Sequence, residues 1–130
     1  MDEPDDCEIT CLHPHAVRAA RAHLPESNNI EAMATLFSVL GDPTRVRLLT
    51  ALLPGELCVC DLATATRLNR TTVSHQLRIL RDHHVVRRRR DGKVVYYSLA
   101  DTHVTTLLGM GAEHAAEGFD LRAGAKWLTA

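Results

Sequence analysis

Apolar residues recur at helical spacing through the first half of the chain. Residues 14–24, rich in alanine, arginine and histidine, predict a short helix that Pro25 ends. A second run of apolar residues, three or four positions apart, predicts a helix that ends at Gly41. The apolar face of this second helix comprises Ile30, Met33, Phe37 and Leu40.

The next helix has a clear beginning and end in the sequence. Asp42 suits the N-cap and Pro43 the first helical position, and Pro54-Gly55 interrupts the chain afterwards. A helix is therefore expected between these two points. The side chains that it is expected to bury are Val46, Leu49, Leu52 and Leu53.

Two short helices joined by a tight turn are expected next. Residues 56–66 form a short segment before Asn69, which suits the N-cap of a helix that runs to about Asp82. Polar residues dominate the outer face of this second helix, which is typical of a helix-turn-helix. Its apolar stripe comprises Val73, Leu77 and Leu80.

A hairpin follows directly. Residues 85–90 and 93–99 have the composition of strands, and Asp91-Gly92 between them is a strong hairpin signal. A hairpin after a recognition helix is the wing of a winged helix. A last helix is expected over residues 101–117. The fold class is therefore mainly α with a small β-hairpin, a winged helix-turn-helix.

The composition is that of one small globular domain. The chain has 130 residues, 45% of them hydrophobic, which argues against global disorder and leaves a core modest enough that a dimer would help. Charged residues interrupt every apolar stretch, so no membrane span is expected. The acidic N-terminus is unlike a signal peptide, so a cytoplasmic location is expected, where cysteines serve more often as metal ligands or redox groups than in disulfides.

The charge is unevenly distributed although its formal net value is −1. Residues 67–93 contain nine basic and two acidic residues, a net charge of +7. The other six basic and fourteen acidic residues give −8. This polarity predicts a basic face that binds nucleic-acid phosphates.

The recognition helix and the wing supply the candidate DNA contacts. With the apolar stripe facing inward, Thr71, Ser74, His75 and Arg78 face outward, while Thr72 and Gln76 lie on the flank. The alternative is a polar face that is only solvated, but the basic residues of the wing favour DNA binding. Arginines on a strand alternate faces, so two of the four in the wing are expected to contact DNA together. The candidate set is Arg70, Thr71, Thr72, Ser74, His75, Gln76, Arg78, Arg87, Arg88, Arg89, Arg90 and Lys93.

The four cysteines occur as two close pairs, Cys7/Cys11 and Cys58/Cys60. Thiolates are soft ligands, and two pairs together provide the four that a tetrahedral site requires. Cys58 and Cys60 are two positions apart, so chelation by them requires a non-helical or frayed first turn. Buried structural cysteines and a redox dithiol switch remain the alternatives.

A second set of candidate ligands lies on the last helix: Asp101, His103, His114 and Glu117. The two histidines share one helix face but are roughly 16 Å apart along the axis, too far for one ion. Two such helices packed antiparallel in a dimer form two symmetric sites with nitrogen and oxygen ligands that suit zinc. A capping aspartate with surface histidines is the alternative.

Four segments together resemble the ArsR–SmtB family of metal-sensing winged-helix repressors. They are Leu40-Gly-Asp-Pro-Thr-Arg-Val-Arg-Leu-Leu, Glu56-Leu-Cys-Val-Cys-Asp-Leu, Thr72-Val-Ser-His-Gln-Leu-Arg-Ile-Leu and Asp91-Gly-Lys-Val-Val-Tyr-Tyr-Ser-Leu. The second is the metal-box motif of the family. With Cys7-Glu-Ile-Thr-Cys11, the chain resembles most the CadC branch, which senses cadmium and lead.

The resemblance implies a homodimer whose metal-free form binds double-stranded operator DNA and represses metal efflux or resistance genes. It further implies that Cys7 and Cys11 of one subunit and Cys58 and Cys60 of the other bind Cd(II), Pb(II) or Zn(II). The set on the last helix matches the family's C-terminal Zn(II) site.

The resemblance also gives a domain division. Residues 1–27 form a metal-binding arm, residues 28–120 the DNA-binding and dimerisation domain, and residues 121–130 a tail.

Two other functions remain open. The chain could be a redox-responsive repressor, in which disulfides replace the metal, or a metal buffer without specific DNA binding. An enzyme is not expected, because the sequence shows no nucleophile–base pair or phosphate loop. Neither a membrane nor an organic small-molecule substrate is expected as a partner.

Overall fold

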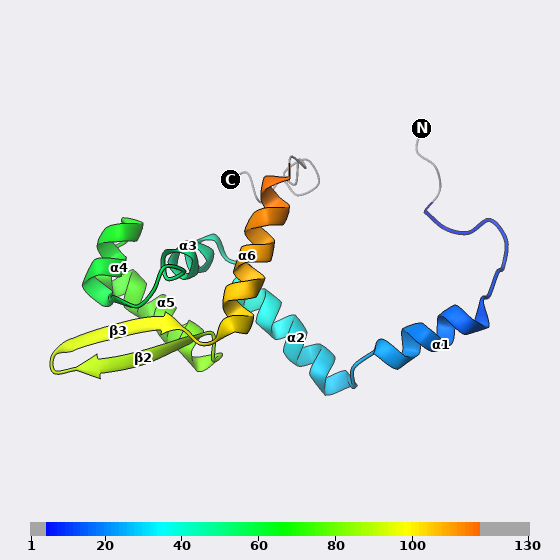
Figure 1. Ribbon diagram of the computed structural model, residues 1–130, viewed down its shortest axis with the longest axis horizontal. Helices are drawn as coiled ribbons and strands as arrows, with labels where there is room; N and C mark the ends of the chain where they lie inside the picture. The colour runs from blue at the N-terminus through cyan, green and yellow to red at the C-terminus, as the bar shows by residue number, and fades with distance from the viewer. Residues whose placement is uncertain (1–4, 118–130) are drawn as a thin grey trace. The chain divides into compact units, whose positions relative to one another are not determined.

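The computed structural model describes residues 5–117, so the expected tail, residues 121–130, lies outside them (Figure 1). The chain divides into two units, residues 1–35 and 36–130. The described part of the first unit contains α1 (Pro14–His23) and most of α2 (Ser27–Leu40). Residues 5–13 form neither helix nor strand, and every side chain from 5 to 35 is exposed.

The second unit has the expected winged helix-turn-helix. After the end of α2 come α3 (Pro43–Ala51), β1 (Leu57–Cys58), α4 (Val59–Thr66) and α5 (Arg70–Asp82). The strands β2 (Val86–Asp91) and β3 (Val94–Leu99) follow, and then α6 (Thr102–Ala116). Figure 1 shows the β2–β3 hairpin extending alongside α4 and α5. The sheet is antiparallel with the order β1-β3-β2, so a two-residue strand that the sequence did not predict adds to the hairpin.

The helix starts follow the predicted caps. The Asp42 carboxylate accepts the backbone N–H of Arg45 at 3.1 Å, and Pro43 occupies the first turn of α3. The Asn69 side chain accepts the backbone N–H of Thr72 at 2.8 Å and begins α5. Each cap satisfies a donor that the helix itself leaves unpaired.

The core lies where the helix-turn-helix meets the sheet. The predicted stripe of α5 is confirmed, because Val73, Leu77 and Leu80 are all fully buried. The other large, fully buried side chains are Leu48, Leu49, Leu52, Leu62 and Val85.

The prediction for α3 was partly wrong. Val46 is 41% exposed and Leu53 36% exposed, whereas Leu48, which was not predicted, is fully buried. The buried stripe is centred between Leu48 and Leu52, and at 100° per residue the two exposed side chains lie roughly 100° away from it.

Candidate nucleic-acid interface and metal-binding pairs

The outer face of α5 has the predicted orientation. Thr71, Ser74, His75 and Arg78 are exposed, while Thr72 and Gln76 are half-buried on the flank. Hydroxyl, imidazole and guanidinium groups on one exposed helix face can donate hydrogen bonds to base edges and phosphates. This exposed face of α5, which we call the reading surface, therefore has the donor groups that the predicted DNA contacts require.

Gln76 forms a hydrogen bond with Arg45, a residue that was not predicted to be part of the site. Its Oε1 accepts from Nε of Arg45 at 3.0 Å, and Nη1 of Arg45 also donates to the carbonyl of Val39 at 3.2 Å. The guanidinium of Arg45 thus links α5 to the end of α2. Gln76 has its amide oxygen engaged, so the amide nitrogen is the group that it can offer to DNA.

The wing arginines alternate faces as expected. Arg88 pairs with Tyr97 across the sheet, and Arg89 pairs with Tyr96. Arg88 lines a hollow together with Arg78 and Arg81 of α5, so guanidinium groups from the helix and from the wing gather there. Such a concentration of positive charge suits a phosphate group.

Arg89, on the other face, is engaged within the protein. Its guanidinium forms a bidentate ion pair with Glu56, with N–O distances of 2.7 and 3.1 Å, and its Cζ lies 4.3 Å from the centre of the Tyr96 ring. The hydrogen bonds from Arg89 lower the pKa of Glu56 below its ordinary value. Sequence reasoning missed Glu56, although it directly precedes the Leu-Cys-Val-Cys segment. Arg89 is thus tied to the base of the sheet.

The second cysteine pair lies beside the reading surface, in a space that we call the thiol hollow. Residues from β1, α4, α5 and β3 meet there, together with Lys93 from the hairpin turn. The thiol hollow is lined by Cys58, Val59, Cys60, Arg70, Ser74, Lys93, Val94 and Val95. Two thiols and three of the candidate DNA contacts therefore share one space.

Cys58 lies outside the regular part of α4, as chelation by this pair requires. It is the N-cap residue, with extended dihedral angles (φ −75°, ψ 163°), and its Sγ accepts the backbone N–H of Asp61 at 3.4 Å. Cys60 is exposed and is the second residue of α4, and Cys58 is half-buried. The extended backbone at Cys58 frees the two thiols from the roughly 200° separation that an ideal helix would impose.

The first cysteine pair is already at a chelating distance. Sγ of Cys11 lies 3.7 Å from Sγ of Cys7, in a segment of bends rather than a helical turn. Four sulfurs at about 2.3 Å from a tetrahedral zinc ion are about 3.8 Å from one another. The separation within this pair therefore fits two corners of a tetrahedral thiolate site.

The four candidate ligands of α6 form two pairs, one at each end of the helix. Nδ1 of His103 lies 3.3 Å from Oδ1 of Asp101, and Nδ1 of His114 lies 4.0 Å from Oε1 of Glu117. Within residues 5–117, no three or more side chains of His, Cys, Asp or Glu cluster in one chain. The candidate ligands of α6 therefore lie as two separate pairs.

Asp101 also caps α6. Its Oδ1 accepts the backbone N–H groups of His103 and Val104 at 2.9 and 3.3 Å. The N–H of Val104, followed by the contacts from His103, holds the pKa of Asp101 below its ordinary value. The carboxylate is thus ionised at neutral pH, and these contacts use Oδ1 alone, which leaves Oδ2 for a metal ion.

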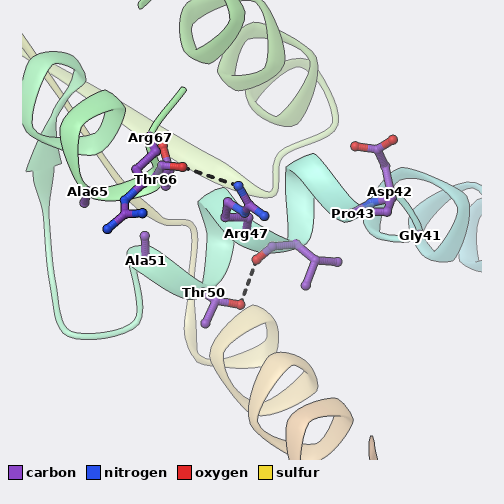
Figure 2. Close-up of a pocket in the computed structure, with 10 residues that line it drawn as sticks. Gly41, Asp42, Pro43, Arg47, Thr50, Ala51, Ala65, Thr66 and Arg67 are labelled. Carbon is purple, nitrogen blue, oxygen red and sulfur yellow. Dashed lines mark hydrogen bonds between the residues drawn. The ribbon is translucent and has the colours of Figure 1, made fainter. Parts of the chain in front are cut away.

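A separate groove of about 970 Å³ lies between α3 and the end of α4 (Figure 2). Figure 2 shows Arg47 directed toward Thr66, and its Nη1 donates to the Thr66 carbonyl at 3.5 Å. No residue predicted as a ligand or a DNA contact lines this groove. It is therefore separate from the candidate sites. No helix within residues 5–117 is both long and apolar enough to cross a membrane.

Comparisons with known proteins identify the family of this chain. Residues 42–88 match the model of the bacterial regulatory proteins of the arsR family. The chain is 46% identical to a transcriptional repressor SmtB homologue from Synechocystis, over 85% of this chain and 84% of that one. It is 40% identical to a cadmium resistance transcriptional regulatory protein, a CadC homologue from Staphylococcus aureus, over 87% and 93%.

A solved structure extends the likeness to the fold. The homodimeric winged helix-turn-helix DNA-binding domain of a possible ArsR-family regulator from Mycobacterium bovis superimposes with a TM-score of 0.67. The two are 29% identical, and the match covers 75% of this chain and 92% of that one. The chain therefore belongs to the arsR family of bacterial regulatory proteins, a family of DNA-binding transcriptional regulators rather than enzymes.

Proposed function

We propose that this chain is a metal-responsive repressor whose metal-free homodimer binds operator DNA and whose metal-bound form releases it. The observation that carries the proposal is the thiol hollow, where Cys58 and Cys60 lie beside Arg70 and Lys93. Ligands for a soft metal and cations for a phosphate are there within one space. By linkage, DNA must weaken metal binding by the same factor as metal weakens DNA binding.

Two metal sites follow in this proposal. Cys7 and Cys11 of one subunit join the partner's Cys58 and Cys60 to bind Cd(II), Pb(II) or Zn(II). The spacing of the first pair and the extended backbone at Cys58 support a tetrahedral thiolate site. The regulated genes encode metal efflux or resistance functions, and the protein acts in the cytoplasm. The SmtB and CadC likenesses support this assignment.

The second site lies between two copies of α6. Asp101 and His103 of one subunit meet His114 and Glu117 of the other and bind Zn(II). A homodimer is further supported by the apolar face of α2, where Ile30, Met33 and Phe37 are about half exposed in the single chain. Apolar faces of this kind are usually covered by a partner.

The decisive experiment compares metal-dependent DNA release by three proteins. We expect the wild type to lose DNA affinity when Cd(II), Pb(II) or Zn(II) is added. Cys58→Ser should lose the response to Cd(II) and Pb(II), while His103→Ala should keep it, because its thiols are intact. A normal response of Cys58→Ser to every metal would show that the thiolate site is not the sensor.

A redox-responsive repressor is the second candidate function. The 3.7 Å contact between the thiols of Cys7 and Cys11 favours it, since close thiols can be oxidised to a disulfide. DNA binding under a strong reductant, with and without a chelator, separates the two functions. A metal switch responds to added metal under reductant, and a redox switch does not.

A further inference from the structure

The thiol hollow brings together groups that bind two different ligands. Arg70 and Lys93 are among the nine cations of residues 67–93, and both line the hollow with Cys58 and Cys60. Arg70 is the first residue of α5 and Lys93 lies in the turn of the hairpin, and both are exposed. Any group held by the two thiols is therefore within the electrostatic range of these two cations.

The segment that carries the first cysteine pair has the opposite charge. Residues 1–12 include five acidic residues and neither lysine nor arginine. Asp6 and Glu8 flank Cys7 directly, and the Asp6 carboxylate accepts the backbone N–H of Cys7 at 2.7 Å. The side chains of residues 5–12 are all exposed. This acidic arm is thus a string of carboxylates built around a thiol.

We propose that the acidic arm of one subunit occupies the thiol hollow of its partner as a phosphate mimic and displaces DNA from Arg70 and Lys93. This inference rests on the proposed function, because the shared metal ion delivers the arm to the hollow. It adds a second element to release. Metal acts by direct competition for cations and not only by changing the geometry of the dimer.

The charge balance supports competition. A divalent ion bound by four thiolates carries a net charge of about −2, and the flanking carboxylates make the loaded arm more negative. The metal complex and a DNA phosphate are both anions and would repel each other in one small hollow. Arg70 and Lys93 can therefore neutralise either the complex or the phosphate, but not both together. A single exposed ion pair contributes little, so the effect depends on several charges acting together.

The first test removes the charge of the arm and keeps its ligands. In the full-length dimer, Asp6→Asn/Glu8→Gln retains the side-chain shapes and the acceptor for the N–H of Cys7. The matched control, Glu26→Gln/Glu31→Gln, removes two charges from exposed residues outside the arm. Cd(II) binding is followed by thiolate-to-metal absorption, and DNA affinity by fluorescence anisotropy with and without Cd(II).

The expected result is a selective loss of coupling. The arm variant should bind Cd(II) with the same stoichiometry, but its Cd(II)-induced loss of DNA affinity should be about fivefold smaller than that of the wild type. The control should match the wild type. Equal release by all three proteins would overturn the phosphate-mimic proposal and leave the proposed function intact. A wild type that keeps its DNA when Cd(II), Pb(II) and Zn(II) are each added would overturn the proposed function itself.

The second test contains no DNA. Arg70→Gln/Lys93→Gln should bind Cd(II) about fivefold more weakly, because the loaded arm loses its counter-charges. The control, Arg78→Gln/Arg88→Gln, removes two cations that line the neighbouring hollow and not the thiol hollow. It should bind Cd(II) as the wild type does. Unchanged affinity in the first variant, or equal losses in both, would show that these two cations play no special part in holding the arm.

Discussion

The proposed metal half-sites in the thiol hollow and on α6 have different surroundings. Cys58 and Cys60 share their space with Arg70 and Lys93, so a metal ion bound there would lie beside two of the predicted DNA contacts. The pairs of α6 lie at the two ends of a helix that packs on β3, and none of their residues lines the thiol hollow. A metal ion bound at α6 would have to act through the arrangement of the two subunits. In the proposed function, the position of a metal site, as well as its ligands, thus decides how a bound metal ion affects DNA binding.

The largest expected effects come from the core beneath each region. Leu77 is fully buried on the inner face of α5, and Leu77→Ala should lower the free energy of unfolding by about 2–5 kcal/mol. Val104 anchors α6 and is 7% exposed, and Val104→Ala should cost about 1–2 kcal/mol, since it removes less apolar surface. Urea unfolding followed by circular dichroism measures both. A loss for Val104→Ala as large as that for Leu77→Ala, although less apolar surface is removed, would show that α6 is at least as firmly packed as α5, which would remove the contrast.

Substitutions of Asp101 distinguish its role as the cap of α6 from its proposed role as a metal ligand. Asparagine caps a helix about as well as aspartate, so Asp101→Asn should keep α6 but weaken zinc binding by about tenfold or more through the loss of a charged ligand. Asp101→Ala should lose both the cap and the ligand. Zinc titration with a competing chelator measures the affinity, and Cd(II)–thiolate absorption should stay unchanged.

This prediction has a clear contrary outcome. If Asp101→Asn binds zinc as tightly as the wild type, Asp101 is only a helix cap. The zinc site at α6 would then be wrong, whereas the thiol hollow would keep its role.

A smaller effect distinguishes the two faces of the wing. Arg88→Gln should reduce the slope of log affinity for DNA against log salt by about 1, because Arg88 faces the hollow with Arg78 and Arg81. Arg89→Gln should change the slope much less, since Arg89 is paired with Glu56. Anisotropy titrations at several salt concentrations measure both slopes. A full unit lost with Arg89→Gln would mean that the pair opens to reach DNA.

The elements that local patterns control were predictable from the sequence. Asp42 and Asn69 act as caps as expected, and the apolar stripe of α5 is buried as its spacing indicated. The error on α3 arose where Val46 competed with Leu48 for the buried face. Both are apolar, and only tertiary packing decides between them.

The parts of the site that were not predicted from the sequence depend on long-range contacts. Glu56 and Arg89 are 33 positions apart, and Arg45 and Gln76 are 31 apart. Residue types identified the cysteines as ligands, but their place beside Lys93 depends on the pairing of β1 with β3. A two-residue strand carries too little periodicity to predict that pairing.

The smallest expected effect is a loss of stability in acid that the two regions share. Arg89 lowers the pKa of Glu56 near the wing, and the N–H of Val104 lowers that of Asp101 at α6. A carboxyl whose pKa is lower in the folded state adds stability above its unfolded pKa, about 4, and loses it as the pH falls through the folded value. Both contributions should therefore be complete at neutral pH and disappear below about pH 4.

Stability measured from pH 7 to pH 2 tests this in Glu56→Gln and Asp101→Asn. Each variant should be slightly less stable than the wild type at neutral pH and should converge with it in acid, because protonation removes the same charge from the wild type. Arg89→Gln should reproduce the profile of Glu56→Gln, since the lowered pKa of Glu56 comes from Arg89. Curves that stay parallel down to pH 2 would show that neither carboxylate gains stability from its charge. Glu56 and Asp101 would then act through shape alone.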